Sequence, residues 1–132
     1  SDVMIAIDTV RKLLALGAVK PFDVLTQSEL LLIAMHALQR HYPPGATVFA
    51  AGQVADMLVI TIAGEAHVLG ERAPTIFDPS SALFGLPVPD AILAGPNGLE
   101  ALCLAKPHLF TIARECPDFV VGLVALATDG IA

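Results

Sequence analysis

The side chains that could carry chemistry are few and widely spaced. Four histidines occur at irregular intervals and without a His-x-His pair: His36, His41, His67 and His108. A zinc or iron site needs several converging ligands, which this spacing does not supply. Glu65 and His67 come nearest to such a site, and we interpret them as the exposed face of one strand, because alternate residues of a strand share a face. We therefore predict no metal site.

The nucleophilic side chains lack the partners that covalent catalysis requires. Ser80 and Ser81 lie in a turn without the Gly-x-Ser-x-Gly pattern, and Cys103 lies in an apolar strand. The second cysteine, Cys116, stands at no metal-binding spacing from the first, so we expect two buried, reduced thiols. We predict no catalytic residue and a protein that is not an enzyme.

Composition argues against several classes of partner. The 132 residues include 7 Lys and Arg against 13 Asp and Glu, a net charge of -6, and the basic residues are scattered. Such a chain has no cluster that displaces phosphate counterions, so we predict no nucleic-acid binding. No window approaches the roughly 18 apolar residues of a membrane span, and no signal peptide is evident, so we predict a cytoplasmic protein. Because 55% of the residues are hydrophobic, we expect a partner to cover part of the surface.

Helical patterns open the sequence. Apolar residues recur at helical spacing before a glycine stop at Gly17: Val3, Ile7, Val10 and Leu14. A second helix begins at Thr26, which forms a capping box with Glu29. Leu25 and Leu30 occupy the staple positions of the same helix start. The N-terminal part of the chain, residues 1–41, is therefore predicted to be helical.

Strand and turn signals fill residues 42–106. Glycine and proline turns recur there, and the apolar runs between them are about 4–8 residues long, the spacing of an antiparallel roll or barrel. Helical signals return at Pro107, which suits the first position of a helix, and at Pro117-Asp118. We predict a single domain with N-terminal helices at residues 1–41, a β region at 42–106 and C-terminal helices at 107–132.

One stretch within the β region is more specific. Residues 40–64 read as an aromatic residue, a Pro-Gly turn, Phe-x-x-Gly-x-x-x-Asp, an apolar strand and a glycine. This cadence resembles the cyclic nucleotide-binding domain family, the β-roll of cAMP-dependent regulators and gated channels. The run Phe-x-x-Leu-Thr-x-x-Glu-Leu at residues 22–30 and Pro-x-Phe at 117–119 are also similar to that family. The resemblance implies a mainly β fold, an antiparallel β-roll (double-stranded β-helix) with N- and C-terminal α-helices.

The resemblance also implies a ligand site. In the family, a cassette reading Phe-Gly-Glu, a short helix and then Arg-x-Ala holds the cyclic phosphate. The matching segment here is residues 83–91. Its ligand-binding candidates form a degenerate cassette: Phe84, Gly85, Leu86, Val88 and Ala91.

The cassette departs from the family pattern where the charged contacts belong. Leu86 stands at the position of the glutamate that takes the ribose hydroxyl, and Ala91 would follow a missing arginine. The intervening helix is not evident in the sequence, and Pro87 and Pro89 have no amide hydrogen to donate. Each lost hydrogen bond to a charged group removes about 1.5–3 kcal/mol, more than tenfold in affinity.

The resemblance thus implies a cyclic nucleotide-binding-like regulatory or sensory domain whose cyclic nucleotide binding is lost or altered, with no cofactor. Leu86, Val88 and Ile92 would make the ligand pocket of the roll, here called the cup, apolar. The cup would then pack closed or take a small apolar ligand. Two alternatives stay open: a genuine cAMP or cGMP module with unconventional contacts, and a cupin-type small-molecule or metal enzyme. The expected partner is another protein or a missing effector segment, and the terminal helices offer a homodimer contact.

Overall fold

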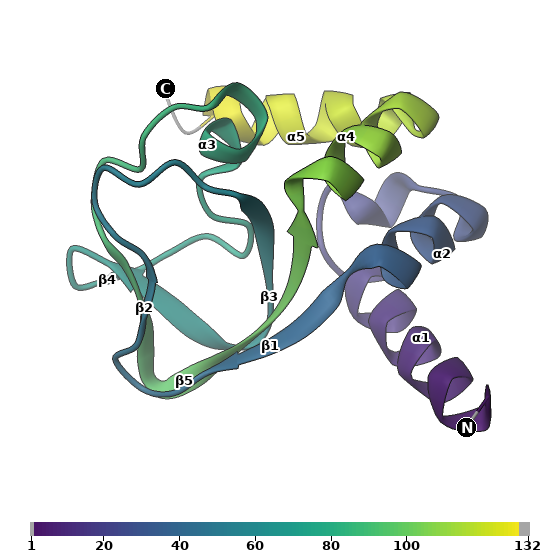
Figure 1. The fold of residues 1–132 in the computed structure, drawn as a ribbon, viewed down its shortest axis with the longest axis horizontal. Helices are drawn as coiled ribbons and strands as arrows, with labels where there is room; N and C mark the ends of the chain where they lie inside the picture. The colour runs from purple at the N-terminus through teal and green to yellow at the C-terminus, as the bar shows by residue number, and fades with distance from the viewer. Residues whose placement is uncertain (1, 130–132) are drawn as a thin grey trace.

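The computed structural model describes residues 2–129, except for the side chains of residues 2, 5–7 and 129. Helices lie at both ends of the chain, with strands between them (Figure 1). In chain order the elements are α1 (Asp2–Gly17), η1 (Phe22–Val24), α2 (Gln27–His36), β1 (Leu38–Tyr42), β2 (Thr47–Phe49), β3 (Met57–Val68), β4 (Glu71–Arg72), α3 (Pro79–Phe84), β5 (Ile92–Ala105), α4 (Lys106–Glu115) and α5 (Pro117–Asp129). This order confirms the mainly β fold with flanking helices.

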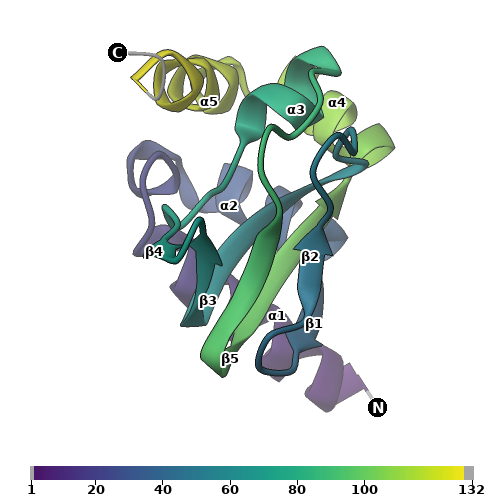
Figure 2. The same cartoon turned by 90° about the vertical axis from the view of Figure 1, so that its left-hand side faces the viewer.

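The sheet is built around β5. This strand pairs with β1, β2 and β3, and β3 also pairs with β4, always antiparallel. The β3–β5 register shifts between Thr61 and Ala63 and again between Gly64 and Ala66. Such irregularities bend a ladder and increase its twist. Figures 1 and 2 show the long strands curling so that the sheet rolls up, with α3, α4 and α5 across one end. The predicted antiparallel β-roll is confirmed.

The centre of the roll is apolar on both long strands. Leu58 and Ile60 of β3 are buried, as are Leu102 and Leu104 of β5. Leu58 pairs with Leu104 and Ile60 with Leu102, so these side chains meet across the ladder. These parts of the two long strands therefore lie inside the fold.

The C-terminal helix α5 is seated on the N-terminal part of the chain. Phe119 is fully buried, and its ring centroid lies 5.4 Å from that of Phe22 in η1. Gly122 faces Pro21 so closely that a Cβ at this position would lie 2.7 Å from Pro21 Cγ. Helix α5 also contacts α3 and α4. A displacement of α3 would therefore be felt by α5 directly.

The apolar side chains predicted for one face of helix α1 are largely exposed. Val3, Val10 and Leu14 are 68%, 55% and 67% exposed, whereas Leu16 near the helix end is buried. The side chain of Ile7, the remaining member of the pattern, lies outside the described residues. An apolar stripe on a helix usually faces a core, but α1 packs only against α2 and η1 among the principal helix and strand contacts.

No helix within residues 2–129 combines the length and apolar character needed to cross a bilayer.

The predicted capping box at the start of α2 is confirmed and can be tested by mutation. The Glu29 amide donates to Thr26 Oγ1 over 3.2 Å, and the Thr26 amide donates to Glu29 Oε1 over 2.9 Å. The bond from the Thr26 backbone lowers the pKa of the Glu29 carboxyl. Thr26→Ala should lower the free energy of unfolding by about 1 kcal/mol, measured by urea denaturation.

A matched threonine provides the control for this prediction. The Thr111 hydroxyl donates to the Pro107 carbonyl inside α4 and caps nothing. Thr111→Ala should change the free energy of unfolding by less than about 0.5 kcal/mol, as surface substitutions usually do. Equal losses in the two variants would contradict a capping role for Thr26.

Candidate functional site

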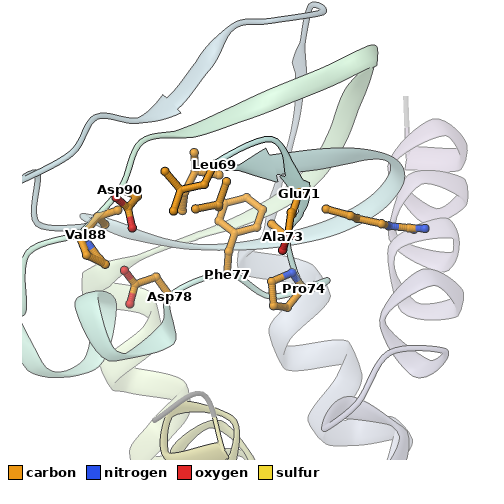
Figure 3. A pocket seen from close by; sticks show the side chains of 12 residues that line it. Leu69, Glu71, Ala73, Pro74, Phe77, Asp78, Val88 and Asp90 are labelled. Atoms are coloured by element: carbon orange, nitrogen blue, oxygen red, sulfur yellow. The ribbon is translucent and has the colours of Figure 1, made fainter. Parts of the chain in front are cut away.

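A cavity of about 470 Å³ opens between the β3–β4 turn and the segments on either side of α3 (Figure 3). Its volume falls in the range of about 300–1,000 Å³ that is typical of small-molecule sites. The sequence left a closed cup and a cup with a small ligand both open, and this cavity has room for the second. Its apolar lining comes from both halves of the roll: Val68, Leu69, Ala73, Pro74, Phe77, Val88, Pro89 and Ile92.

The floor of the cavity is preformed by buried side chains. Phe77, Val88 and Ile92 are almost wholly buried, and the Phe77 ring packs edge-on against Phe49 with centroids 6.3 Å apart. Two backbone hydrogen bonds hold the loop after α3: the Val88 amide donates to the Gln53 carbonyl over 2.8 Å, and the Gly52 amide donates to the Val88 carbonyl over 2.7 Å. This double contact fixes the wall that carries Val88.

Charged groups stand around the apolar floor. Carboxylates reach the lining from three separate segments: Glu71 in β4, Asp78 before α3 and Asp90 after it. The cation among the lining residues is Arg72, whose Nε lies 3.6 Å from Glu65 Oε2 and whose side chain is 73% exposed. Figure 3 shows Asp78 and Asp90 at one end of the cavity, beside Val88. The lining is therefore net negative, and its guanidinium is engaged by a further carboxylate.

Asp78 has the most unusual backbone in this region. Its φ of 49° and ψ of 55° place it in the left-handed region, just before the first turn of α3. Its side chain does not cap the helix, and Ser80 Oγ donates to Asp78 Oδ1 over 3.3 Å instead. Non-glycine residues in this conformation are uncommon, although aspartate tolerates it better than most. Strained residues of this kind concentrate at functional sites.

Helix α3 itself was not expected from the sequence. It begins with Pro79 at its first turn and ends at Gly85, which takes a φ of 71° as the C-cap. These are recognised start and stop signals, but the sequence pattern predicts a turn at Ser80 and Ser81. The helix ends at Phe84, directly before Gly85, whereas the family pattern places a helix after the Phe-Gly pair.

The position of α3 redistributes the predicted site residues. Phe84 is 60% exposed at the end of α3, Gly85 caps the helix, and Leu86 is 54% exposed. Val88 lines the cavity, whereas Ala91 is half-buried and is not part of the lining. The structure therefore brings one of the five candidates to the cavity. The sequence did not predict the lining residue Phe77. Its position as an aromatic residue directly before Asp78-Pro79 could have indicated it.

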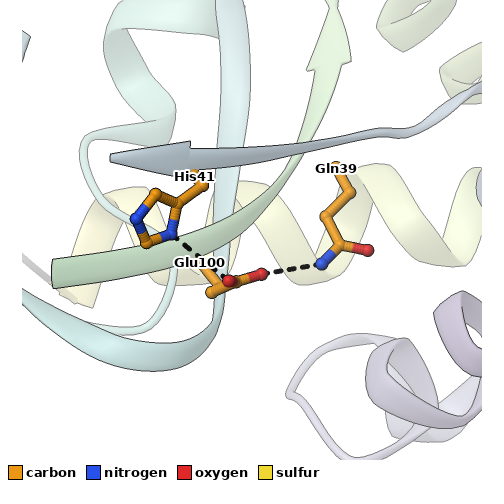
Figure 4. Close-up of polar contacts among 3 residues, drawn as sticks. All are labelled: Gln39, His41 and Glu100. Atoms are coloured by element: carbon orange, nitrogen blue, oxygen red, sulfur yellow. Dashed lines mark hydrogen bonds and ion pairs between the residues drawn. The ribbon is translucent and has the colours of Figure 1, made fainter. Parts of the chain in front are cut away.

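Two of the four histidines, His41 and His67, have carboxylate partners on the sheet. His41 Nδ1 lies 3.3 Å from Glu100 Oε1, and Gln39 Nε2 donates to Glu100 Oε2 over 2.7 Å (Figure 4). His67 Nε2 lies 3.0 Å from Glu65 Oε1. Exposed pairs such as His41–Glu100 contribute about 0–1 kcal/mol and organise no reaction centre. Among the described side chains, no three of His, Cys, Asp or Glu gather as a metal site.

The two thiols are structural. Cys103 and Cys116 are buried and unpaired with each other. Burial raises the pKa of each thiol. A thiol with a raised pKa carries little thiolate at neutral pH, and thiolate is the reactive form. This agrees with the expectation of two buried, reduced cysteines.

Comparison with solved structures decides what this roll resembles. The catabolite activator protein of Thermus thermophilus superposes with a TM-score of 0.70 and 22% identity over 83% of this chain and 57% of that one. The regulatory domain of Toxoplasma gondii PKA with cAMP gives a TM-score of 0.72 and 15% identity over 88% and 49%. A cyclic nucleotide-binding-like protein from Brucella abortus gives a TM-score of 0.60 and 18% identity over 79% and 98%.

This chain has the fold of a cyclic nucleotide-binding domain. The chain spans about half the length of the first two of these structures, at 57% and 49%. Neither a protein-family model nor a curated protein sequence matches it. Within the cyclic nucleotide-binding fold, the cavity beside α3 is the candidate ligand site.

Proposed function

We propose that this chain is a non-enzymatic regulatory domain of the cyclic nucleotide-binding fold that does not hold a cyclic nucleotide by the family's contacts. The charge of the cavity carries the proposal. Where the resemblance places an arginine, two residues before Ala91, the chain has Pro89, and the next residue is Asp90. A carboxylate about 4 Å from a phosphate would repel it by roughly 4 kcal/mol near a protein surface.

The backbone of the site reinforces this preference. Pro74 and Pro89 line the cavity and have no amide hydrogen with which to bind a phosphate oxygen. Arg72 could approach a phosphate only by leaving Glu65, and its side chain is largely exposed to solvent. Several contacts that a cyclic phosphate needs are therefore replaced by groups that repel it or cannot donate to it.

Regulation in this proposal passes through α3. Ligand contacts at Asp78 or Val88 act on the two ends of the segment that contains α3, and α3 packs against α5. A ligand that prefers one position of α3 shifts the population of that position. A partner in the cytoplasm, either another protein or an effector segment, then binds in a way that depends on the position of α5.

A thermal-shift screen with cAMP, cGMP and ATP tests the proposal. A nucleotide present at a hundred times its Kd stabilises the folded state by about 2.7 kcal/mol, which raises the melting temperature by several degrees. We expect no such rise with any of the three at about 1 mM, the range that separates weak from useful affinity. A rise that grows with cAMP or cGMP concentration would support the alternative of unconventional nucleotide binding.

A further inference from the structure

We propose that the cavity beside α3 binds a small organic ammonium ion with an apolar body, such as an arylalkylamine. This inference rests on the proposed function, because it assigns the same cavity a ligand of opposite charge to a cyclic nucleotide. Its basis is the meeting of a buried apolar floor with carboxylates from three segments of the chain. Such a combination suits a ligand with a hydrophobic part and one positive charge.

The apolar body would lie on the floor. Phe77, Val88 and Ile92 are buried and in place without a ligand, since the Val88 wall is held by backbone hydrogen bonds to the turn at Gly52 and Gln53. The Phe77 ring lies in the middle of the labelled side chains in Figure 3. An aromatic or alkyl chain therefore finds both area and a ring on this floor.

The ammonium group would lie between Asp78 and Asp90. Both side chains are half-buried at the same end of the cavity, whereas Glu71 is exposed toward the solvent. An ammonium has three donors and no acceptor, so carboxylate oxygens satisfy it. Arg72 does not compete for these two carboxylates, because its guanidinium pairs with Glu65. Charge complementarity thus favours a cation over a neutral ligand and disfavours an anion.

An organic cation fits this site better than a bare metal ion. Within the described residues, no three of His, Cys, Asp or Glu converge closely enough to coordinate a metal. The carboxylates instead stand around an apolar volume of about 470 Å³, which a metal ion would leave unfilled. A contact at Asp78 would also act on the strained residue that precedes α3, which links occupancy to the helix.

Three probes of nearly equal size separate charge from hydrophobicity. The full chain would be titrated calorimetrically with 2-phenylethylamine, 2-phenylethanol and 3-phenylpropanoate, with cAMP as a fourth titrant. We expect the amine to bind at least about tenfold more tightly than the alcohol, because charge-assisted hydrogen bonds are the stronger class. The carboxylate should give no saturable heat. Equal binding of amine and alcohol, or no binding of the amine, would overturn the inference.

Substitutions locate the binding. Asp78→Asn with Asp90→Asn should weaken amine binding at least about tenfold, while Asp23→Asn, on the exposed η1 segment outside the lining, should leave it unchanged. Asparagine also adopts the left-handed conformation of Asp78, and the melting temperature checks that the variant folds. Should that double variant fail to fold, Asp90→Asn alone replaces it, and amine binding should still weaken because one of the two carboxylates is gone. Amine affinity unchanged in the folded charge variants would refute the assignment.

The titration with cAMP distinguishes a failure of this inference from a failure of the proposed function. Saturable cAMP binding would refute the proposed function, and the amine inference with it. Flat titrations with both cAMP and the amine would refute the amine inference and leave the loss of cyclic nucleotide binding in place.

Discussion

Gly64→Ala is expected to lower the free energy of unfolding by about 3 kcal/mol or more, the largest effect of any glycine substitution in the roll. Gly64 has a φ of +71°, and a Cβ added there would overlap the carbonyl oxygen of Gly98 on the neighbouring strand. The left-handed conformation alone costs a side chain about 1–2 kcal/mol. Crowding against a backbone atom adds about 1–3 kcal/mol, since a strand cannot swing away as a side chain can.

Gly52→Ala is the matched control, measured by urea denaturation beside Gly64→Ala. Gly52 has a φ of +83°, but an added Cβ would have no heavy atom within 4 Å. This variant should therefore lose only the conformational cost of about 1–2 kcal/mol. Equal losses at the two positions would show that the close approach of β3 and β5 at Gly64 is not as described.

Phe119→Ala is expected to lower the free energy of unfolding by about 3–5 kcal/mol. Phe119 is fully buried and its ring packs against that of Phe22, so its removal leaves a cavity where α5 meets η1. Because α5 also contacts α3, the variant should in addition loosen the proposed link between the cavity and the C-terminal helix. Relative to the unsubstituted chain, amide hydrogen exchange should speed up more in α5 and α3 than in β5.

Phe110 offers the comparison for this substitution. It lies on α4 and is 44% exposed, so Phe110→Ala removes an aromatic ring without opening a buried cavity. We expect a loss below about 1 kcal/mol, as is usual for positions away from the core. A Phe119→Ala loss as small as this would mean that α5 is not anchored through the Phe22 contact.

Local signals in the sequence were sufficient for most of the fold. The Thr26–Glu29 capping box depends on residues three apart, and it forms as predicted. The apolar runs predicted as strands of about 4–8 residues became parts of β3 and β5, which are 12 and 14 residues long and continue through Gly64 and through residues 95–98. Signals of this kind are contained in neighbouring residues, which is why sequence alone was enough.

Helix α3 shows where local signals end. With six residues it is too short for a helical period to be visible, and its Asp-Pro-Ser start also fits a turn. Most of the predicted cassette therefore lies away from the cavity, because Phe84 ends this helix, Leu86 follows it, and both are exposed. Similarly, the apolar spacing of α1 predicted a helix correctly but could not say whether anything covers that face.

The character of the site was the least predictable feature. Glu71, Asp78 and Asp90 belong to separate segments, and only the curl of the sheet and the position of α3 bring them to one cavity. The sequence did indicate the absence of an arginine and of the cassette glutamate. It could not indicate that carboxylates would line the cup in their place.

Calorimetric titration of the full chain with cAMP and cGMP asks whether the cavity of this cyclic nucleotide-binding fold rejects the cyclic phosphate. We expect no saturable heat up to about 1 mM nucleotide. A saturable isotherm with a Kd in the micromolar range, weakened by substitution of Val88 in the cavity floor, would contradict it.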